Sequence, residues 1–196
     1  MKNTLTIVVA FVAVLGFTMV PALALEKPII TLEKVEVASI QPFFVKPRVG
    51  YKDEKEPGKE LANGAILNMA YVLDIKNPNK APVMLEDLSF TTAFEGFDVN
   101  TAMVYENQWI PGGKTNQLRV VVTNETLPTL GSLTVGASNV PRLQEMKTTA
   151  PALVQKWWDS VGDFSFPIEV TAGTALFKDE KGKEVRATFS GKWPKK

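Results

Sequence analysis

The sequence predicts a mainly β protein: an antiparallel β-sandwich of about seven strands, with one amphipathic helix before a C-terminal hairpin. Three observations predict it. Apolar residues alternate with polar ones along most segments after residue 28, which is typical of strands with one buried face. Gly, Pro, Asn and Asp residues separate these segments as turns. Residues 140–161 instead place their apolar side chains at helical spacing. Many short strands with one inserted helix favour a sandwich.

The N-terminal residues predict export. Lys2 supplies a basic start, an apolar run follows, and Ala22-Leu23-Ala24 has the small-x-small shape that a signal peptidase accepts. We therefore expect residues 1–24 to be a signal peptide. The alternative is an uncleaved membrane anchor, because residues 4–25 carry no charge and would span about 33 Å as a helix. Either reading places residues 25–196, a single β-sandwich domain, outside the cytoplasm, in the periplasm or the extracellular space.

Composition narrows the chemistry. The chain has no cysteine and no histidine, so disulfides, thiol chemistry and a Ser-His-Asp triad are excluded. The absence of histidine also removes the commonest zinc ligand and general base. We expect a non-enzymatic protein with no catalytic residue, no cofactor and no metal site, although carboxylate-only chemistry stays open. The net charge of +1 predicts no nucleic-acid partner, because such binding needs a concentrated basic face.

After the predicted signal peptide, residues 30–75 predict a strand, a loop and a central strand. The strand covers 30–37, with a bulge between Leu32 and Val35. Residues 46–64 are polar and rich in Pro and Gly, so a solvated loop is the default and a binding loop the alternative. Residues 65–75 are apolar on both faces, which is typical of a central strand.

The second half adds further strands and the helix. The remaining predicted strands are 82–94, 97–105, 118–122 with a continuation at 133–135, and the C-terminal pair 164–177 and 185–193 around a turn at 179–182. Asn139 is the expected N-cap of the helix, and Pro151 should kink or split it. Thr148 or Thr149 would then cap the second part.

The segment that follows the predicted central strand contains a motif that is similar to one in a known protein family. Its motif is an Asn-Pro step, a short polar connection and a second strand with spaced apolar residues, namely Asn77, Pro78, Pro82, Val83, Leu88 and Phe90. This pattern resembles the late embryogenesis abundant type 2 family, which contains the water stress and hypersensitive response (WHy) domain. The later order also resembles that family, with an Ile-Pro-Gly-Gly turn, a strand, a helix and a hairpin. The resemblance covers about residues 60–193.

The resemblance implies a fibronectin- or immunoglobulin-like sandwich with a role in desiccation or other stress. It implies no catalytic residues, and the six motif residues are expected to be structural. The predicted function is an exported protective or binding domain with protein clients. The alternative is a structural or accessory subunit of a membrane protein assembly, anchored through residues 4–25 and partnered by other subunits.

Three other patterns have ordinary structural interpretations. Trp157 and Trp158 lie on the apolar arc of the predicted helix, so burial is favoured over a ligand platform. The acidic residues Asp53, Glu54 and Glu56 lie in a lysine-containing loop and lack metal-site spacing, so a solvated loop is favoured. Residues 112–115 end like a phosphate-binding loop, but the motif's first glycine is missing and no helix follows. We interpret them as a turn.

Overall fold

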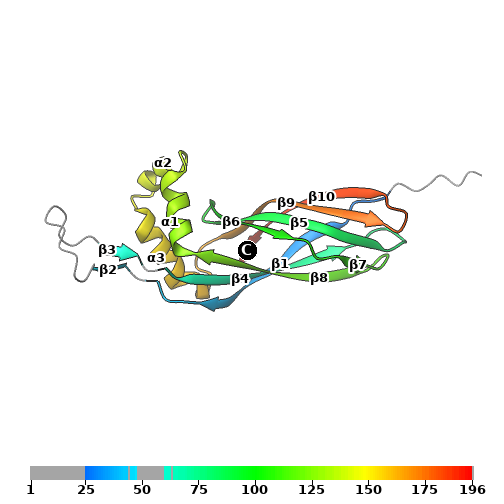
Figure 1. Ribbon diagram of the computed structural model, residues 1–196, viewed down its shortest axis with the longest axis horizontal. Helices are drawn as coiled ribbons and strands as arrows, with labels where there is room; N and C mark the ends of the chain where they lie inside the picture. The colour runs from blue at the N-terminus through cyan, green and yellow to red at the C-terminus, as the bar shows by residue number, and fades with distance from the viewer. Residues whose placement is uncertain (1–24, 44, 48–59, 63, 196) are drawn as a thin grey trace, which may run out of the picture.

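The computed structural model describes residues 25–43, 45–47, 60–62 and 64–195. Two antiparallel sheets face each other along the length of the molecule, and a group of short helices closes one end (Figure 1). The prediction of a mainly β sandwich is therefore confirmed. The predicted signal segment at 1–24, and most of the predicted loop at 46–64, lie outside the described residues.

The smaller sheet has three strands in the order β1-β4-β8. They are β1 (Ile29–Ile40), β4 (Ile66–Lys76) and β8 (Thr115–Glu125). The predicted central position of 65–75 is confirmed, because β4 pairs on both sides and buries residues on both faces. The predicted bulge in the first strand is also present, as a register shift between Leu32 and Lys34.

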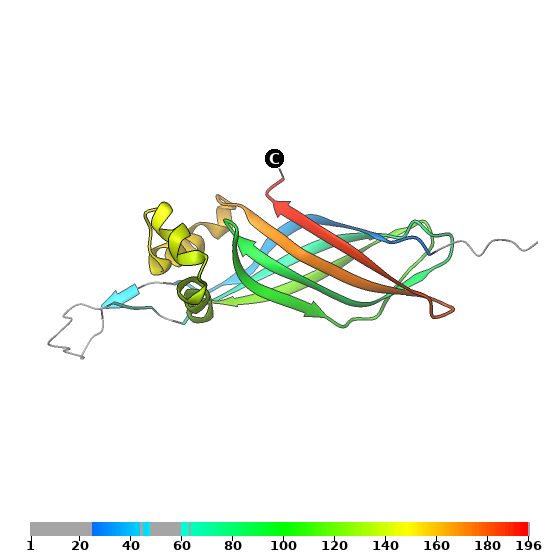
Figure 2. The ribbon, with the colours of Figure 1, turned by 90° about the horizontal axis from the view of Figure 1, so that it is seen from above.

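The larger sheet has the order β10-β9-β5-β6, with β7 also paired to β5 (Figure 2). Its strands are β5 (Val83–Phe94), β6 (Phe97–Val104), β7 (Gln108–Ile110), β9 (Ile168–Asp179) and β10 (Glu184–Trp193). The predicted hairpin turn is confirmed. Asp179 Oδ1 accepts hydrogen bonds from the backbone N–H of Lys181 (2.9 Å) and Lys183 (2.8 Å), and Gly182 supplies the positive φ of 82°.

The structure corrects the predicted number of strands. Beyond the two large sheets, β2 (Val45–Pro47) pairs with β3 (Glu60–Ala62), so both ends of the predicted loop form a short ladder. These two strands and β7 have three residues each. A strand so short has no alternation to detect, which is why a count of about seven falls short.

The predicted number of helices is too small. The sequence predicts one helix before the hairpin, and the described chain has three α-helices followed by a 3₁₀ turn. They are α1 (Thr126–Val135), α2 (Asn139–Glu145), α3 (Ala150–Ser160) and η1 (Val161–Asp163). The strand predicted at 133–135 is also wrong, because these residues form the last turn of α1. Within the described ranges, no helix is both long and apolar enough to cross a bilayer.

Local chemistry explains where the helices start. Thr149 caps α3, since its Oγ1 accepts a hydrogen bond from the backbone N–H of Ala152 at 3.4 Å, and Pro151 lies in the first turn. The predicted split and cap are therefore confirmed. Asn139 is not an N-cap; its amide donates to the carbonyl of Ser132 at 3.1 Å instead. The strand predicted from 164 begins only at 168, because Phe164 has a left-handed φ of 48°.

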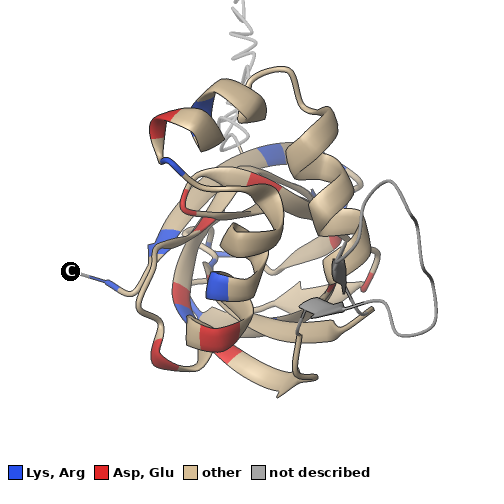
Figure 3. Cartoon of the chain, turned by 90° about the vertical axis from the view of Figure 1, so that its left-hand side faces the viewer, with Lys and Arg blue, Asp and Glu red and all other residues tan. Residues whose placement is uncertain are grey.

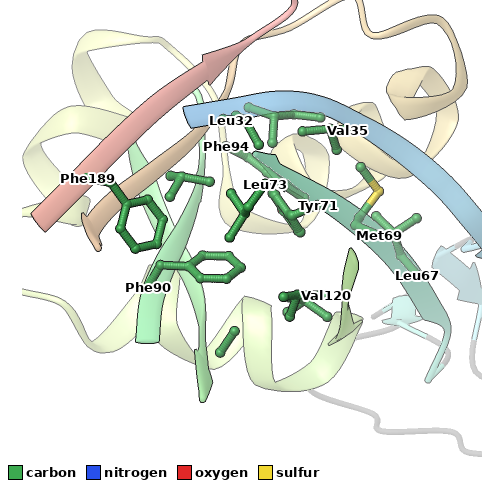
Figure 4. Packing of buried hydrophobic residues seen from close by; sticks show 14 of the residues in the cluster. Leu32, Val35, Leu67, Met69, Tyr71, Leu73, Phe90, Phe94, Val120 and Phe189 are labelled. Carbon is green, nitrogen blue, oxygen red and sulfur yellow. The ribbon is translucent and has the colours of Figure 1, made fainter. Parts of the chain in front are cut away.

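The core lies between the sheets, where their alternating side chains meet (Figure 4). Tyr71 of β4 packs edge-on against Phe90 of β5 with ring centroids 5.4 Å apart, and Phe90 in turn packs against Phe189 of β10 at 6.1 Å. Such edge-to-face pairs add stability beyond the area that they bury. At the helical end, Trp157 is fully buried and Trp158 nearly so. Their predicted core role is confirmed.

One long side of the sandwich is closed. There β1 and β10, which are edge strands of different sheets, run against each other. A Cβ atom on Gly191 of β10 would lie only 2.5 Å from Cβ of Leu32 in β1, so the two strands approach at a distance that glycine alone permits. We call this the closed side.

Candidate functional site

The six motif residues contribute to a hydrogen-bonded turn around Asn77 and to the core face of strand β5. Asn77 is fully buried, and its Nδ2 donates to the carbonyls of Ala81 (2.9 Å) and Ile110 (3.0 Å). Its Oδ1 accepts from both the backbone N–H and the side-chain amide of Asn79, each at 2.9 Å. Asn79 in turn exchanges two hydrogen bonds with the backbone of Glu26. Asn77 therefore ties three chain segments together at the end opposite the helices.

The rest of the motif completes this scaffold. Val83, Leu88 and Phe90 are buried along the core face of β5, while Pro78 and Pro82 are half-buried on either side of the turn. These contacts give the motif a structural role, and Leu88 also lines the smaller pocket described below.

Gly112 and Gly113, next to the hydrogen-bonded turn around Asn77, form a turn, as predicted. A Cβ atom on Gly112 would overlap the carbonyl oxygen of Lys80, which explains why glycine is needed there. The N–H of Gly113 donates to the carbonyl of Asn79 at 2.9 Å, so this donor is already used. A phosphate-binding loop needs free backbone N–H groups, and the N–H of Gly113 is not free.

A second polar cluster joins the helices to the β5–β6 turn. The carboxylate of Glu95 accepts a hydrogen bond from Lys156 Nζ at 2.6 Å and another from Trp157 Nε1 at 2.9 Å. Arg142 donates to the carbonyls of Glu95 and Gly96, and its guanidinium lies 4.4 Å from the ring centroid of Phe97. Figure 3 shows positive and negative residues interspersed at this end. We interpret the cluster as a latch that holds the helices on the sandwich.

Among the described residues, no three His, Cys, Asp or Glu side chains lie close enough to hold a metal ion. The acidic residues at 53–56 lie outside the described ranges. Burial raises the pKa of the Tyr71 phenol, with a smaller opposing effect from Thr92, so Tyr71 stays protonated and cannot act as a base near neutral pH. The Glu95 carboxylate is already paired.

The other long side of the sandwich is open along its middle. Here β6 and β7 form the edge of the larger sheet, and β8 forms the edge of the smaller one. Two asparagine side chains bridge them. Asn100 Nδ2 donates to the carbonyl of Thr123 at 2.7 Å near the helical end, and Asn116 Nδ2 donates to the carbonyl of Trp109 at 3.0 Å near the other end. We call these two hydrogen bonds the asparagine bridges.

Between the asparagine bridges lies an open groove of about 590 Å³, which we call the edge groove. It is lined by Met103, Val104, Tyr105 and Glu106 on one side and by Leu118, Arg119, Val120 and Val121 on the other. Three of its apolar side chains face solvent: Met103 is 66% exposed, Tyr105 77% and Val121 49%. Residues 105–107 lie between β6 and β7 and outside the ladder with β5, which leaves the sheet edge interrupted there.

A smaller pocket of about 180 Å³ adjoins the edge groove on the outer face of the larger sheet. It shares Met103 and Tyr105 with the groove, so these two side chains form a ridge between the two hollows. Its other walls are mostly polar and include Asp87 and Arg186, beside a hydrogen-bonded Ser89–Thr174 pair (3.0 Å). The open side thus combines an apolar ridge with polar walls, which is typical of binding surfaces.

The sequence did not predict the edge groove. A signal existed in the strand predicted at 97–105, where Ala102 and Val104 alternate with Met103 and Tyr105. If one set faces the core, the other set must place apolar side chains on the outer face.

Comparison with known proteins leaves the family open. No protein family model and no curated protein matches the chain. Solved structures with a similar β-rich fold include a protein from Archaeoglobus fulgidus (10% identity, 81% of this chain, 98% of that chain, TM-score 0.36). Two others are the structural genomics target SoR45 (14%, 85%, 87%, 0.42) and AT1g01470 from Arabidopsis thaliana (9%, 86%, 82%, 0.46). At these identities and TM-scores, the chain is similar to them in β-rich architecture and no family follows.

Proposed function

We propose that this chain is an exported, non-enzymatic protective or binding domain of the late embryogenesis abundant type 2 class, acting in desiccation or a related stress. In this proposal the edge groove contacts apolar segments of client proteins that have begun to unfold. The motif from Asn77 to Phe90 supports the class, and the signal-like N-terminus supports export. The absence of histidine and cysteine from the sequence supports a role without catalysis.

One observation supports binding most directly: the exposed apolar ridge of Met103 and Tyr105 beside the edge groove. Single exposed apolar side chains are common on protein surfaces, but a contiguous group beside a hollow is typical of an interaction site. Methionine adapts its shape to different partners, and tyrosine offers a large rigid surface with a polar end. A surface of this kind suits many clients rather than one.

The test is protection of a client enzyme during drying. An enzyme that loses activity on drying is dried with the full-length chain, or with an inert protein at equal mass, and its activity is measured after rehydration. The chain should preserve more activity than the inert protein. A chain carrying both Met103→Ser and Tyr105→Ser should lose at least half of that advantage.

A matched double variant tests whether protection depends on the edge groove or on exposed apolar side chains anywhere on the surface. Val135 and Met146 are also exposed apolar residues, but they lie on the helical end. A chain with Val135→Ser and Met146→Ser should protect as the unmodified chain does. If the chain protects no better than the inert protein, or if both double variants lose protection equally, the proposal is wrong.

A second candidate function rests on the uncharged residues 4–25, which are long enough to stay in a membrane as an anchor. The chain would then be an accessory subunit of a membrane assembly. The mass of the protein isolated from its native membrane or export fraction distinguishes the two. A chain that begins at Leu25 contradicts the anchor, and a chain that begins at Met1 contradicts cleavage.

A further inference from the structure

The backbone of β8 has two sides, and its hydrogen bonds identify which side faces outward. The N–H of Thr126 donates to Ala65 at 3.0 Å and the carbonyl of Lys114 accepts from Asn77 at 2.9 Å, so even-numbered residues point their backbone groups toward β4. The carbonyl of Thr123 accepts from the side chain of Asn100, on the opposite side. Backbone groups alternate along a strand, so odd-numbered residues of β8 point away from β4.

Three of these residues lie between the asparagine bridges: Gln117, Arg119 and Val121. Their outward N–H and C=O groups have no backbone partner within the described parts of the chain. Because β8 pairs with β4 through eleven residues without a register shift, these groups form a regular row. Donors and acceptors in such a row recur every second residue, at about 6.6 Å, which is the spacing of an extended polypeptide.

This edge also lacks most of the features by which proteins usually block strand pairing. Natural edge strands carry bulges, charged side chains or prolines, or are covered by another element. The one charged side chain of β8 between the asparagine bridges, Arg119, contacts Glu36 of β1. β1 has two register shifts, and β10 has a shift at Phe189/Gly191 and a lysine at 192. Residues 115–125 of β8 contain no proline, no lysine and no register shift. The edge is therefore regular where the groove opens beside it.

We propose that an extended segment of a partner polypeptide, about five residues long, pairs with β8 inside the edge groove. Its backbone would bond with Gln117, Arg119 and Val121, and alternate side chains would contact Met103 and Tyr105. This is strand addition, in which backbone bonds give affinity that tolerates many sequences. The inference rests on the proposed function, because it states how a client would be held.

The row of outward groups selects this partner over others. A small molecule rarely repeats donor and acceptor at strand spacing, whereas every extended peptide does. A second copy fits poorly, because its own β8 is flanked by β4 on one side and bridged to β6 and β7 on the other. An unfolding client, by contrast, supplies short extended segments with free backbone groups.

The test uses a fluorescent heptapeptide of alternating Thr and Val with Lys at both ends, N-methylated on alternate amides so that only one edge can pair. Its binding to the full-length chain is measured by fluorescence anisotropy. Val121→Pro removes one outward N–H without removing a ladder bond to β4, a position where proline is tolerated. We expect binding about tenfold weaker, from one lost hydrogen bond and one unpaired peptide carbonyl.

Two controls make the result specific. Val121→Ala shortens the same side chain but keeps the N–H, and should bind within about threefold of the unmodified chain. A peptide methylated on every amide should not bind. If Val121→Pro binds as well as Val121→Ala, or if the fully methylated peptide binds, strand addition is wrong.

Hydrogen exchange gives an answer even if Val121→Pro fails to fold. In the unmodified chain, the amides of Arg119 and Val121 should exchange quickly, and the peptide methylated on alternate amides should slow both at least tenfold. Unchanged exchange with bound peptide would overturn the inference. So would a dimer, in sedimentation of the chain alone, that Val121→Pro abolishes, because the occupant would then be a second copy. Protection during drying is measured separately, so a chain that binds the peptide but protects nothing contradicts only the proposed function.

Discussion

The two long sides of this sandwich solve the problem of exposed strand edges in different ways. On the closed side, Gly191 lets β10 lie directly against Leu32 of β1. On the open side, one asparagine bridge joins β8 to β6 and the other joins β8 to β7, and the edge groove opens between the two bridges. The absence of a Cβ atom at one position can therefore decide whether two sheet edges come into contact. Where glycine is present the edges touch, and where asparagine spans them a surface remains.

The largest effect should come from filling the closed side. Gly191→Ala would place a Cβ atom within 2.5 Å of Leu32, so the sheets must separate or the core must shift. We expect the free energy of unfolding to fall by about 2 kcal/mol. Denaturant unfolding measures it. As a control, Gly131→Ala in α1 meets no atom within 4 Å and should raise stability by up to about 1 kcal/mol. Equal effects at both glycines would contradict the contact.

A smaller effect should come from removing the asparagine bridges. Asn100→Ala and Asn116→Ala each delete one hydrogen bond between the edges of the two sheets, and each should lower stability by about 1 kcal/mol. Thermal unfolding of each single variant checks the loss. Gln117→Ala, an exposed neighbour on β8, should change stability by less than about 0.5 kcal/mol. Losses no larger than that of Gln117→Ala would show that the bridges do not hold the edges.

A still smaller effect on stability should follow from changes on the open side's exposed ridge. Met103→Ser combined with Tyr105→Ser should alter the free energy of unfolding by no more than about 0.5 kcal/mol, because both side chains already face solvent. Denaturant unfolding of this double variant separates stability from protection. A loss above about 2 kcal/mol would identify these side chains as part of the core and would weaken the drying experiment.

The smallest effect concerns a charged strap on the outer face of the smaller sheet, between the closed and open edges. Glu36 of β1 contacts Lys34 at 2.6 Å and Arg119 of β8 at 3.4 Å. Hydrogen bonding to Lys34, with a smaller effect from Arg119, holds the pKa of Glu36 below its usual value. A lowered folded pKa means that this contribution is present above the unfolded pKa and is lost as pH falls through the folded pKa.

NMR titration of the Glu36 carboxyl carbon measures this pKa. Lys34→Gln should raise it toward the usual value more than Arg119→Gln does, because Lys34 is the stronger of the two partners. The reverse order would show that the strap from β1 to β8 is stronger than the contact within β1.

The sequence predicts the central strand and the hairpin well, because their signals are local. Leu67, Met69 and Tyr71 alternate over a long run, and residues 179–182 form a turn that needs no distant partner. The Asn77 motif was predicted from its spacing, but its four side-chain hydrogen bonds to Ala81, Asn79 and Ile110 could not be read from that spacing.

Features that depend on distant contacts were not predicted. α1 follows directly from β8 in a segment rich in threonine, which favours strands over helices. Its start is fixed by Thr126, whose Oγ1 accepts from the distant N–H of Ala65 at 2.9 Å. The edge groove likewise depends on two asparagines bridging separate sheets, and in the sequence each one is an ordinary polar residue near a strand end.

The frame of the edge groove is built from uncharged amides and carbonyls. Such contacts neither titrate nor weaken through ionic screening, whereas the Glu95 latch at the helical end depends on opposite charges. With no histidine anywhere in the chain, no side chain ordinarily changes its charge between about pH 5 and 8. The width of the opening should therefore stay constant while a drying film concentrates its salts and drifts in acidity.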